Sequence, residues 1–452
     1  MLGLFIILVI LAVVFLRFRT DYNKGLSASL FFIILMPPNS TIELSAALPS
    51  FTIHRLILFV WFVMWIRNKT ITKRLGDIPF FKILLMISAV FAVSTALSSY
   101  LLVSIKRYFY FLIEAVLFFI MLQTSLKNRT VVSNVVIAIS ASLAVVAFIG
   151  VLEKYTGFNP SPYLGEKLRY EFEVDHTGLA TDIISTYLHR ILFGIAMAIG
   201  MMHYFYHIDK MNTRLQNIIY WLLLSINGAG LYFSLSRGPW LAFVVSILLL
   251  LVIAPKEVFI KSLVLMAVVG IVFIIKPGAK STIMGLARST GDETSLKGAS
   301  FRWRFIVWNM AYTSITKSSI MHTIFGYGGG SHLFMEFGRV LLPTGHSALF
   351  ESWDMEYAVI LFEQGFVGFF LTLFFYIAIL KKSIAHCFRK KQDYKIMQLA
   401  LACFFIIVFM KTNVNIYAPQ LDYIEYVYIA IISALTSERY QLSIDKTDNE
   451  KQ

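Results

Sequence analysis

Charged residues are scarce in this sequence. They make up 15% of its 452 residues, whereas 58% are hydrophobic and 15% are aromatic. A soluble globular domain has about 25% charged and 45–50% apolar residues. Together with a mean hydropathy of +0.72, this composition excludes an ordinary soluble protein.

Cysteine is almost absent as well. Cys387 lies beside a basic loop and Cys403 lies inside an apolar run, so neither is on a long loop where an oxidising compartment could pair it. The sequence also lacks a pair of His or Cys at metal-ligand spacing with a third ligand nearby, and any phosphate-loop or dinucleotide fingerprint. We therefore expect no disulfide framework, no metal and no cofactor.

Apolar runs of about 16–24 residues, bounded by Lys, Arg or Pro, fill most of the chain, and this length crosses roughly 30 Å of hydrocarbon as a helix. Alternating segments of about ten residues, typical of a membrane β-barrel, are missing. The predicted fold class is therefore all-α, a polytopic membrane protein. The expected spans are 2–16, 26–44, 51–66, 78–99, 107–126, 131–152, 183–206, 215–233, 239–254, 258–275, 357–380, 396–411 and 422–436. Because Pro37-Pro38 interrupts the second, we count 12 or 13.

The basic residues lie in short clusters between these runs. The net charge of +14 could indicate a nucleic-acid partner, but clusters such as 67–74 and 381–391 follow the positive-inside pattern of a membrane protein. We therefore expect the bilayer, and no nucleic acid, as the partner of these charges.

Placing 381–395 in the cytoplasm orients every other loop by alternation. Residues 1–275 then form transmembrane helices with an outward loop near 153–182, and 276–356 form a large outward loop. Residues 357–436 form the last spans, and 437–452 form a cytoplasmic tail.

The large outward loop contains an amphipathic pattern. Phe301, Phe305, Trp308, Tyr312 and Ile315 recur at spacings of 4, 3, 4 and 3 residues, which predicts one apolar helix face. We expect this helix to lie on the outer membrane interface, followed by a flexible glycine turn at 326–330.

Arg237 stands in a minimal turn between two spans, in the segment Ser234 to Trp240. An outward arginine runs against the positive-inside bias. It could anchor the chain at the interface beside Trp240, or it could clamp an anion, because a guanidinium presents a fixed fork to phosphate. We favour the anion clamp, with Ser236 in support.

Two further arginines, Arg302 and Arg304, lie on the predicted loop helix. They could be ordinary solvated charges on its polar face, or they could join Arg237 in binding an anion.

A third group of polar residues lies at the mouth of the span that begins near 357. His346, Asp354 and Glu356 are candidates for a general base, because crowding and partial burial move a carboxylate toward neutrality, and Tyr357 supports them. A hydrated loop end would look the same. Glu363 falls inside the span, where an ionised group is costly, so we expect Arg237, Arg302 or Arg304 to pair with it.

These residues resemble, in order and spacing, the bacterial O-antigen ligase and polymerase (Wzy-type) family. The resemblance runs from about 131 to 380. The matching segments are Glu153-x-x-Thr156-Gly157, Ser236-Arg237-Gly238, Arg304-x-x-x-Trp308, Gly326-x-Gly328, Asp354-x-Glu356-Tyr357 and Glu363-x-Gly365-x-x-Gly368. Ligases of this family open the Asp354 motif with His-Asn, whereas polymerases place an Asp there, so this chain looks more like a polymerase.

The resemblance implies a GT-C-like glycosyltransferase of the bacterial inner membrane with its site facing outward. The implied donor is an undecaprenyl-diphosphate-linked oligosaccharide, no metal is needed, and Arg237 and Arg304 grip the diphosphate. Chain-length regulator and flippase proteins are the implied partners. A ligase that transfers the polymer to a lipid or protein acceptor, and a lipid-linked sugar transporter, stay open as alternatives.

Overall fold

The computed structural model describes residues 2–38, 41–42, 51–68, 77–164, 183–207, 213–254, 256, 258–265, 267, 296–334, 340–341, 347–348, 353–389, 393–415 and 419–437. Nearly all of them are helical. The longer helices are α1 (Leu2–Thr20), α2 (Tyr22–Leu35), α3 (Ile53–Arg67), α4 (Phe81–Ala96), α5 (Leu101–Phe111), α6 (Phe118–Ser125), α7 (Arg129–Thr156), α8 (Arg190–His207), α9 (Arg214–Phe233), α10 (Arg237–Ile253), α13 (Leu296–Thr316), α14 (Ile320–Phe325), α15 (Glu356–Phe388), α16 (Tyr394–Met410) and α17 (Pro419–Leu435).

Short elements complete the described chain. A π-helix, η2 (Leu112–Leu117), joins α5 to α6, and three 3₁₀ turns are η3 (Ser161–Leu164), η4 (Ser185–Tyr187) and η6 (Ser331–Phe334). Strands β1 (Thr41–Ile42) and β2 (Phe51–Thr52) pair antiparallel, with Thr41 opposite Thr52. Strands β3 (Val340–Leu341) and β4 (Ser347–Ala348) also pair antiparallel, with Val340 opposite Ala348.

Several helices have the length and composition of membrane spans. Helices α1, α7 and α15 are long and apolar enough to cross a membrane, and α2, α4, α8, α10 and α16 are shorter apolar helices. The predicted all-α class is therefore confirmed and agrees with a membrane protein, while the number and topology of the spans stay predictions. The second expected span is shorter than predicted, because α2 ends at Leu35, just before Pro37-Pro38.

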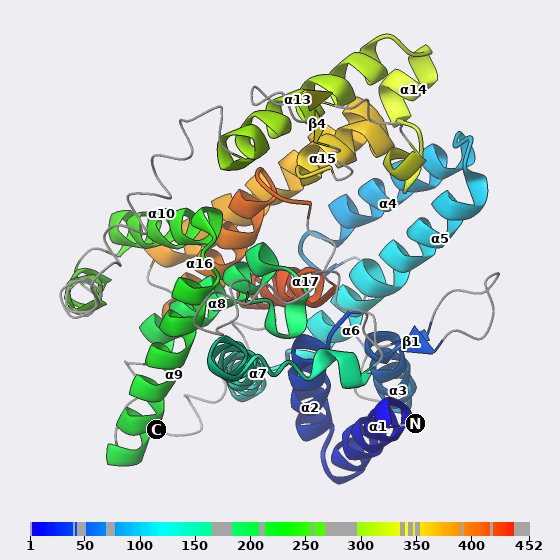
Figure 1. Ribbon diagram of the computed structural model, residues 1–452. Helices are drawn as coiled ribbons and strands as arrows, with labels where there is room; N and C mark the ends of the chain where they lie inside the picture. The colour runs from blue at the N-terminus through cyan, green and yellow to red at the C-terminus, as the bar shows by residue number, and fades with distance from the viewer. Residues whose placement is uncertain are drawn as a thin grey trace.

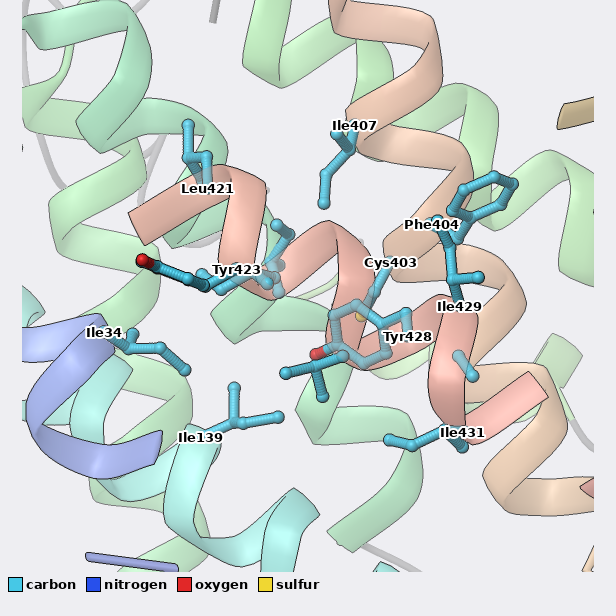
Figure 2. Close-up of a cluster of buried hydrophobic side chains, with 14 of the residues drawn as sticks. Ile34, Ile139, Cys403, Phe404, Ile407, Leu421, Tyr423, Tyr428, Ile429 and Ile431 are labelled. Carbon is cyan, nitrogen blue, oxygen red and sulfur yellow. The ribbon is translucent and has the colours of Figure 1, made fainter. Parts of the chain in front are cut away.

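Helix α17 runs through the middle of the bundle (Figure 1). Its sequence is apolar on every side and almost all of its side chains are buried, as expected for a helix surrounded by other helices. Figure 2 shows this core: Tyr423 and Tyr428 on α17 lie among aliphatic side chains of α2, α7 and α16. Cys387 and Cys403 are both buried, and the two do not form a disulfide.

Several helices begin at the same end of the bundle, here called the Gln420 end. The side-chain amide of Gln420, at the start of α17, donates to the carbonyl oxygens of Met36 (2.7 Å) and Thr186 (3.1 Å). His54, at the start of α3, also bonds to Met36 O. The opposite end is marked by an ion pair between Arg129 and Asp393 at 2.7 Å.

The helix of the large loop, α13, packs against α15, with α14 beside it (Figure 1). The residues of the predicted apolar face are divided between the protein and the surroundings. Ile315 is buried together with Trp303, Val307 and Ala311, whereas Phe305 and Tyr312 are 63% and 48% exposed. Phe305 and Tyr312 are therefore available to the surroundings, and the place of this helix at the membrane interface stays a prediction.

Candidate functional site

Arg237 is the first residue of α10, and only residues 234–236 separate it from α9. The turn is tight: Leu235 has a left-handed φ of +47°, a conformation that costs an L-residue about 1–2 kcal/mol. Gly238 lies against Met410 of α16, where a Cβ would come within 2.9 Å of the Met410 Cε atom. The turn holds Ser236 buried and leaves Arg237 half-buried at the Gln420 end.

A second arginine, Arg190, lies beside this turn. It is the first residue of α8, and two residues before it Leu188 also has a left-handed φ, +57°. The start of α8 touches the Arg237 turn, because a Cβ on Gly194 would lie 2.9 Å from both Pro239 Cγ and Ser234 Oγ. Burial lowers the pKa of Arg237, and the positive charge of Arg190 lowers it further, so the two guanidinium groups act on each other electrostatically.

The approach to Arg190 is fixed by a buried carboxylate. Glu153, in the last turn of α7, is fully buried and accepts the backbone N–H of Ser185 at 2.7 Å and of Ile184 at 3.4 Å. These residues lie at η4, a few residues before Arg190. The carboxylate therefore anchors the segment that leads into α8.

Arg304 of α13 is the third arginine of this group. Its Nε donates to the carbonyl oxygen of Asn413 at 2.8 Å. Burial lowers the pKa of Arg304, the nearby Asp354 carboxylate raises it and the Arg237 guanidinium lowers it. Arg190, Arg237 and Arg304 thus form one cationic group, here called the arginine cluster, with Asp354 at its edge.

Arg302 has a different environment from Arg304. It is exposed, and two residues correspond to about 200° around a helix, so its side chain leaves α13 on another side. Its predicted part in anion binding stays a prediction.

Glu356 and Tyr357, at the start of α15, are held by the end of α16. Lys411 is buried and its Nζ lies 3.4 Å from Glu356 Oε1, 2.8 Å from Glu425 Oε2 and 3.0 Å from the Tyr376 hydroxyl. The Tyr357 hydroxyl donates to Val408 O at 3.0 Å. Glu356 is therefore engaged in an ion pair through one of its oxygens, and its role as a base stays a prediction.

The expected arginine partner of Glu363 is wrong, because the carboxylate pairs with a histidine. Glu363 Oε1 lies 2.5 Å from His332 Nδ1 and 2.5 Å from the backbone nitrogen of Gly330. The Glu363 carbonyl oxygen accepts the hydroxyl of Ser94, in the last turn of α4. Since α4 ends at Ala96, Glu363 lies at the end of the bundle rather than deep in a span.

Two glycines explain this arrangement. Gly365 has φ +64° and ψ −170°, which breaks α15 into two helical segments. The break frees the carbonyl groups of Phe362 and Glu363 to accept the N–H groups of Tyr327 (3.1 Å) and Gly328 (2.9 Å). A Cβ on Gly326 would lie 2.3 Å from the Glu363 carbonyl carbon. The glycine turn at 326–330, expected to be flexible, is therefore docked tightly onto α15.

Comparison with known protein families identifies part of this chain. The model of the O-antigen ligase family matches residues 221–373, from α9 to the second segment of α15. This stretch of the chain is similar to the O-antigen ligase family. No curated protein matches the chain.

The stretch that matches the family model includes Arg237, Arg304, His332, Asp354 and Glu363. Arg190 lies outside that stretch, so the arginine cluster combines the matched stretch with the helix that precedes it. His346 lies outside the described residues. Among the residues that the structure describes, no three His, Cys, Asp or Glu side chains are grouped so that they could hold a metal ion.

Three residues of the site were missed in the sequence. Arg190 had a usable signal, because it is a basic residue on the outward side of an expected span, as Arg237 is. His332 and Lys411 had none. Their partners lie 31 residues away for His332 and 55 and 14 residues away for Lys411, and only the packing of α4, α15, α16 and α17 brings them together.

Proposed function

We propose that the chain is a polysaccharide polymerase of the O-antigen ligase family. It transfers a growing glycan from undecaprenyl diphosphate onto a lipid-linked repeat unit, in the bacterial inner membrane with the Gln420 end facing outward. The observation that supports this best is the arginine cluster, which gathers three guanidinium groups beside the first turns of α8 and α10. Guanidinium forks and helix N-termini both favour phosphate groups.

The cluster suits the leaving group of such a transfer. An acceptor hydroxyl attacks the anomeric carbon of the donor glycan, the bond to the diphosphate breaks, and undecaprenyl diphosphate leaves with the electron pair. Arg190, Arg237 and Arg304 stabilise the charge that develops on the diphosphate. Fixed cations at the edge of a membrane need little reorganisation to do so, and one such contact contributes roughly 3 kcal/mol.

The attacking hydroxyl must lose its proton, and Asp354 and His346 are the first candidates for its base. Asp354 lies next to the arginine cluster and occupies the position where the resembling ligases have histidine. The proposed chemistry is metal-independent, because the charge on the diphosphate is met by arginines.

The second candidate function is that of a ligase, which transfers the finished polymer to a lipid or protein acceptor. The similarity of residues 221–373 to the O-antigen ligase family favours it. A transporter of lipid-linked sugar is less well supported, since the charged residues gather at one end of the bundle and not at its middle.

One experiment separates these functions. Membranes of a strain that lacks the chain accumulate lipid-linked repeat units, and the purified protein is added to their extract with and without a chelator. A ladder of lipid-linked products indicates a polymerase, single transfer to an added lipid core indicates a ligase, and unchanged lipids indicate a transporter. Arg190→Gln and Arg237→Gln should each weaken either transfer, and loss of both should abolish it.

A further inference from the structure

The His332–Glu363 pair has a ring nitrogen to which the described residues supply no partner. Glu363 can only accept hydrogen bonds when ionised, so the His332 Nδ1 that faces it is the donor. In a neutral imidazole Nε2 is then the acceptor. Within the part of the chain that the structure describes, no hydrogen-bond partner is found for Nε2, and the His332 side chain keeps 9% of its surface exposed. The pair therefore presents a free basic nitrogen at the Gln420 end.

The pair is also rigidly supported. Glu363 receives the Gly330 N–H on the same oxygen, and its backbone is held by Ser94 and Gly328. The ring of His332 packs edge-on against Trp353, with centroids 5.8 Å apart. A base that is oriented by a carboxylate and fixed by packing is the arrangement used to remove a proton from a hydroxyl group.

Its separation from the arginine cluster fits a direct displacement. The first segment of α15 runs from Glu356, near Lys411 and Asn413, to Glu363. Glu363 follows Glu356 by seven residues, which corresponds to a rise of about 10 Å along the helix axis. The pair is therefore about this far from the start of α15, where Asp354 and Arg304 lie. In inverting glycosidases the groups that serve the leaving oxygen and the attacking oxygen are about 6.5–9.5 Å apart, because these oxygens lie on opposite faces of the sugar.

We propose that His332, oriented by Glu363, is the base of the reaction, an inference that rests on the proposed glycosyl transfer. The acceptor oxygen bonds to the anomeric carbon as its proton moves to His332 Nε2, and the bond from that carbon to the diphosphate oxygen breaks. Undecaprenyl diphosphate leaves with the electron pair, held by the arginine cluster. The imidazolium, stabilised by Glu363, then releases the proton to water.

Asp354 has a different part in this scheme. Its charge interacts with that of Arg304, which puts it on the leaving-group side of the sugar. A carboxylate there balances the arginine cluster when no diphosphate is bound. It is poorly placed to reach a hydroxyl on the opposite face.

The test compares His332→Gln, Glu363→Gln and Asp354→Asn, using lipid-linked repeat units extracted from membranes of the deletion strain. A glutamine at 332 can still donate to Glu363, so the fold is kept while the base is lost. We expect kcat to fall about 10²–10⁴-fold, with unchanged binding of undecaprenyl diphosphate. The fall in rate at acidic pH, caused by protonation of the imidazole, should disappear in His332→Gln and should shift in Glu363→Gln.

A matched control is His322→Gln. His322 lies in the same region, on α14, but bonds to the Gly326 carbonyl oxygen and not to a carboxylate, so its loss should leave the pH profile unchanged. If His332→Gln keeps its rate within threefold and its pH profile, or if Asp354→Asn is the variant that removes the acidic fall, the assignment of His332 is overturned. Normal activity of the Arg237 and Arg304 variants would instead overturn the proposed function.

Discussion

Arg304 donates a hydrogen bond from Nε to the carbonyl oxygen of Asn413, 2.8 Å away and 109 residues further along the chain. Two residues before Asn413, Lys411 accepts the Glu356 N–H through its own carbonyl oxygen at 3.1 Å. The short segment between α16 and α17 therefore holds both the arginine of α13 and the start of α15. This segment sets where the arginine cluster meets the edge of the proposed site.

Arg304→Lys should lose most of its activity although it keeps the charge. An ammonium group cannot both bond to Asn413 O and present a fork to a diphosphate, and a hydrogen bond to a charged group contributes about 1.5–3 kcal/mol, roughly 10- to 100-fold in rate. Arg302→Lys, two residues away and exposed, is the matched variant and should lose less. Equal losses in a polymerisation assay would place both arginines at the anion.

Arg237→Lys should reduce transfer roughly a hundredfold, about 3 kcal/mol, if its guanidinium faces the leaving group. Arg214→Lys provides the comparison, since Arg214 is an exposed first residue of α9 at the other end of that helix. Both variants are assayed at matched expression. Normal products from Arg237→Lys would make Arg237 an interfacial anchor only.

Gly365→Ala should destabilise the protein, because its φ is +64° and the new Cβ would lie 2.4 Å from Ile324 O. Gly157→Ala has nearly the same φ, +68°, but an added Cβ meets nothing within 4 Å. It reports the backbone strain alone, about 1–2 kcal/mol. Thermal unfolding in detergent should show a clearly larger loss for Gly365→Ala, and equal losses would mean that the glycine turn is not docked as described.

Lys411→Met should destabilise the protein by about 3–5 kcal/mol, because it leaves the buried carboxylate of Glu425 and the half-buried carboxylate of Glu356 without their cation. Adding Glu425→Gln to it should recover part of the loss, since one uncompensated charge is removed. Unfolding temperatures of the single and double variants test this. If the double variant is no more stable than the single one, Glu425 is not a principal partner of Lys411.

The Gln420 end should face outward. A cysteine at Ile320, 72% exposed on α14, should react with an impermeant thiol reagent in intact cells. A cysteine at the exposed Arg389, after α15, should react only after the membrane is opened. The native cysteines are buried and give little background. The opposite pattern would invert the orientation and exclude an outward site.

The sequence by itself determined the helical class of the protein and the position of the turn that holds Arg237. Apolar runs must be helical in a membrane, because no other structure satisfies the backbone there, so α7, α15 and α16 follow from composition and length. The turn at Arg237 follows from two such runs with almost nothing between them.

Only the tertiary structure decided which side chains meet. On α13 the spacing of large apolar residues predicted one apolar face, but it did not show that Trp303, Val307 and Ala311 pack against the protein while Phe305 stays exposed. In a membrane protein an apolar side chain can face lipid as well as protein, so hydrophobicity does not distinguish the two. The ion-pair partners of Glu363 and Glu356 could not be predicted from the sequence either. Ion pairs between distant segments depend on how helices pack, and local sequence does not specify that packing.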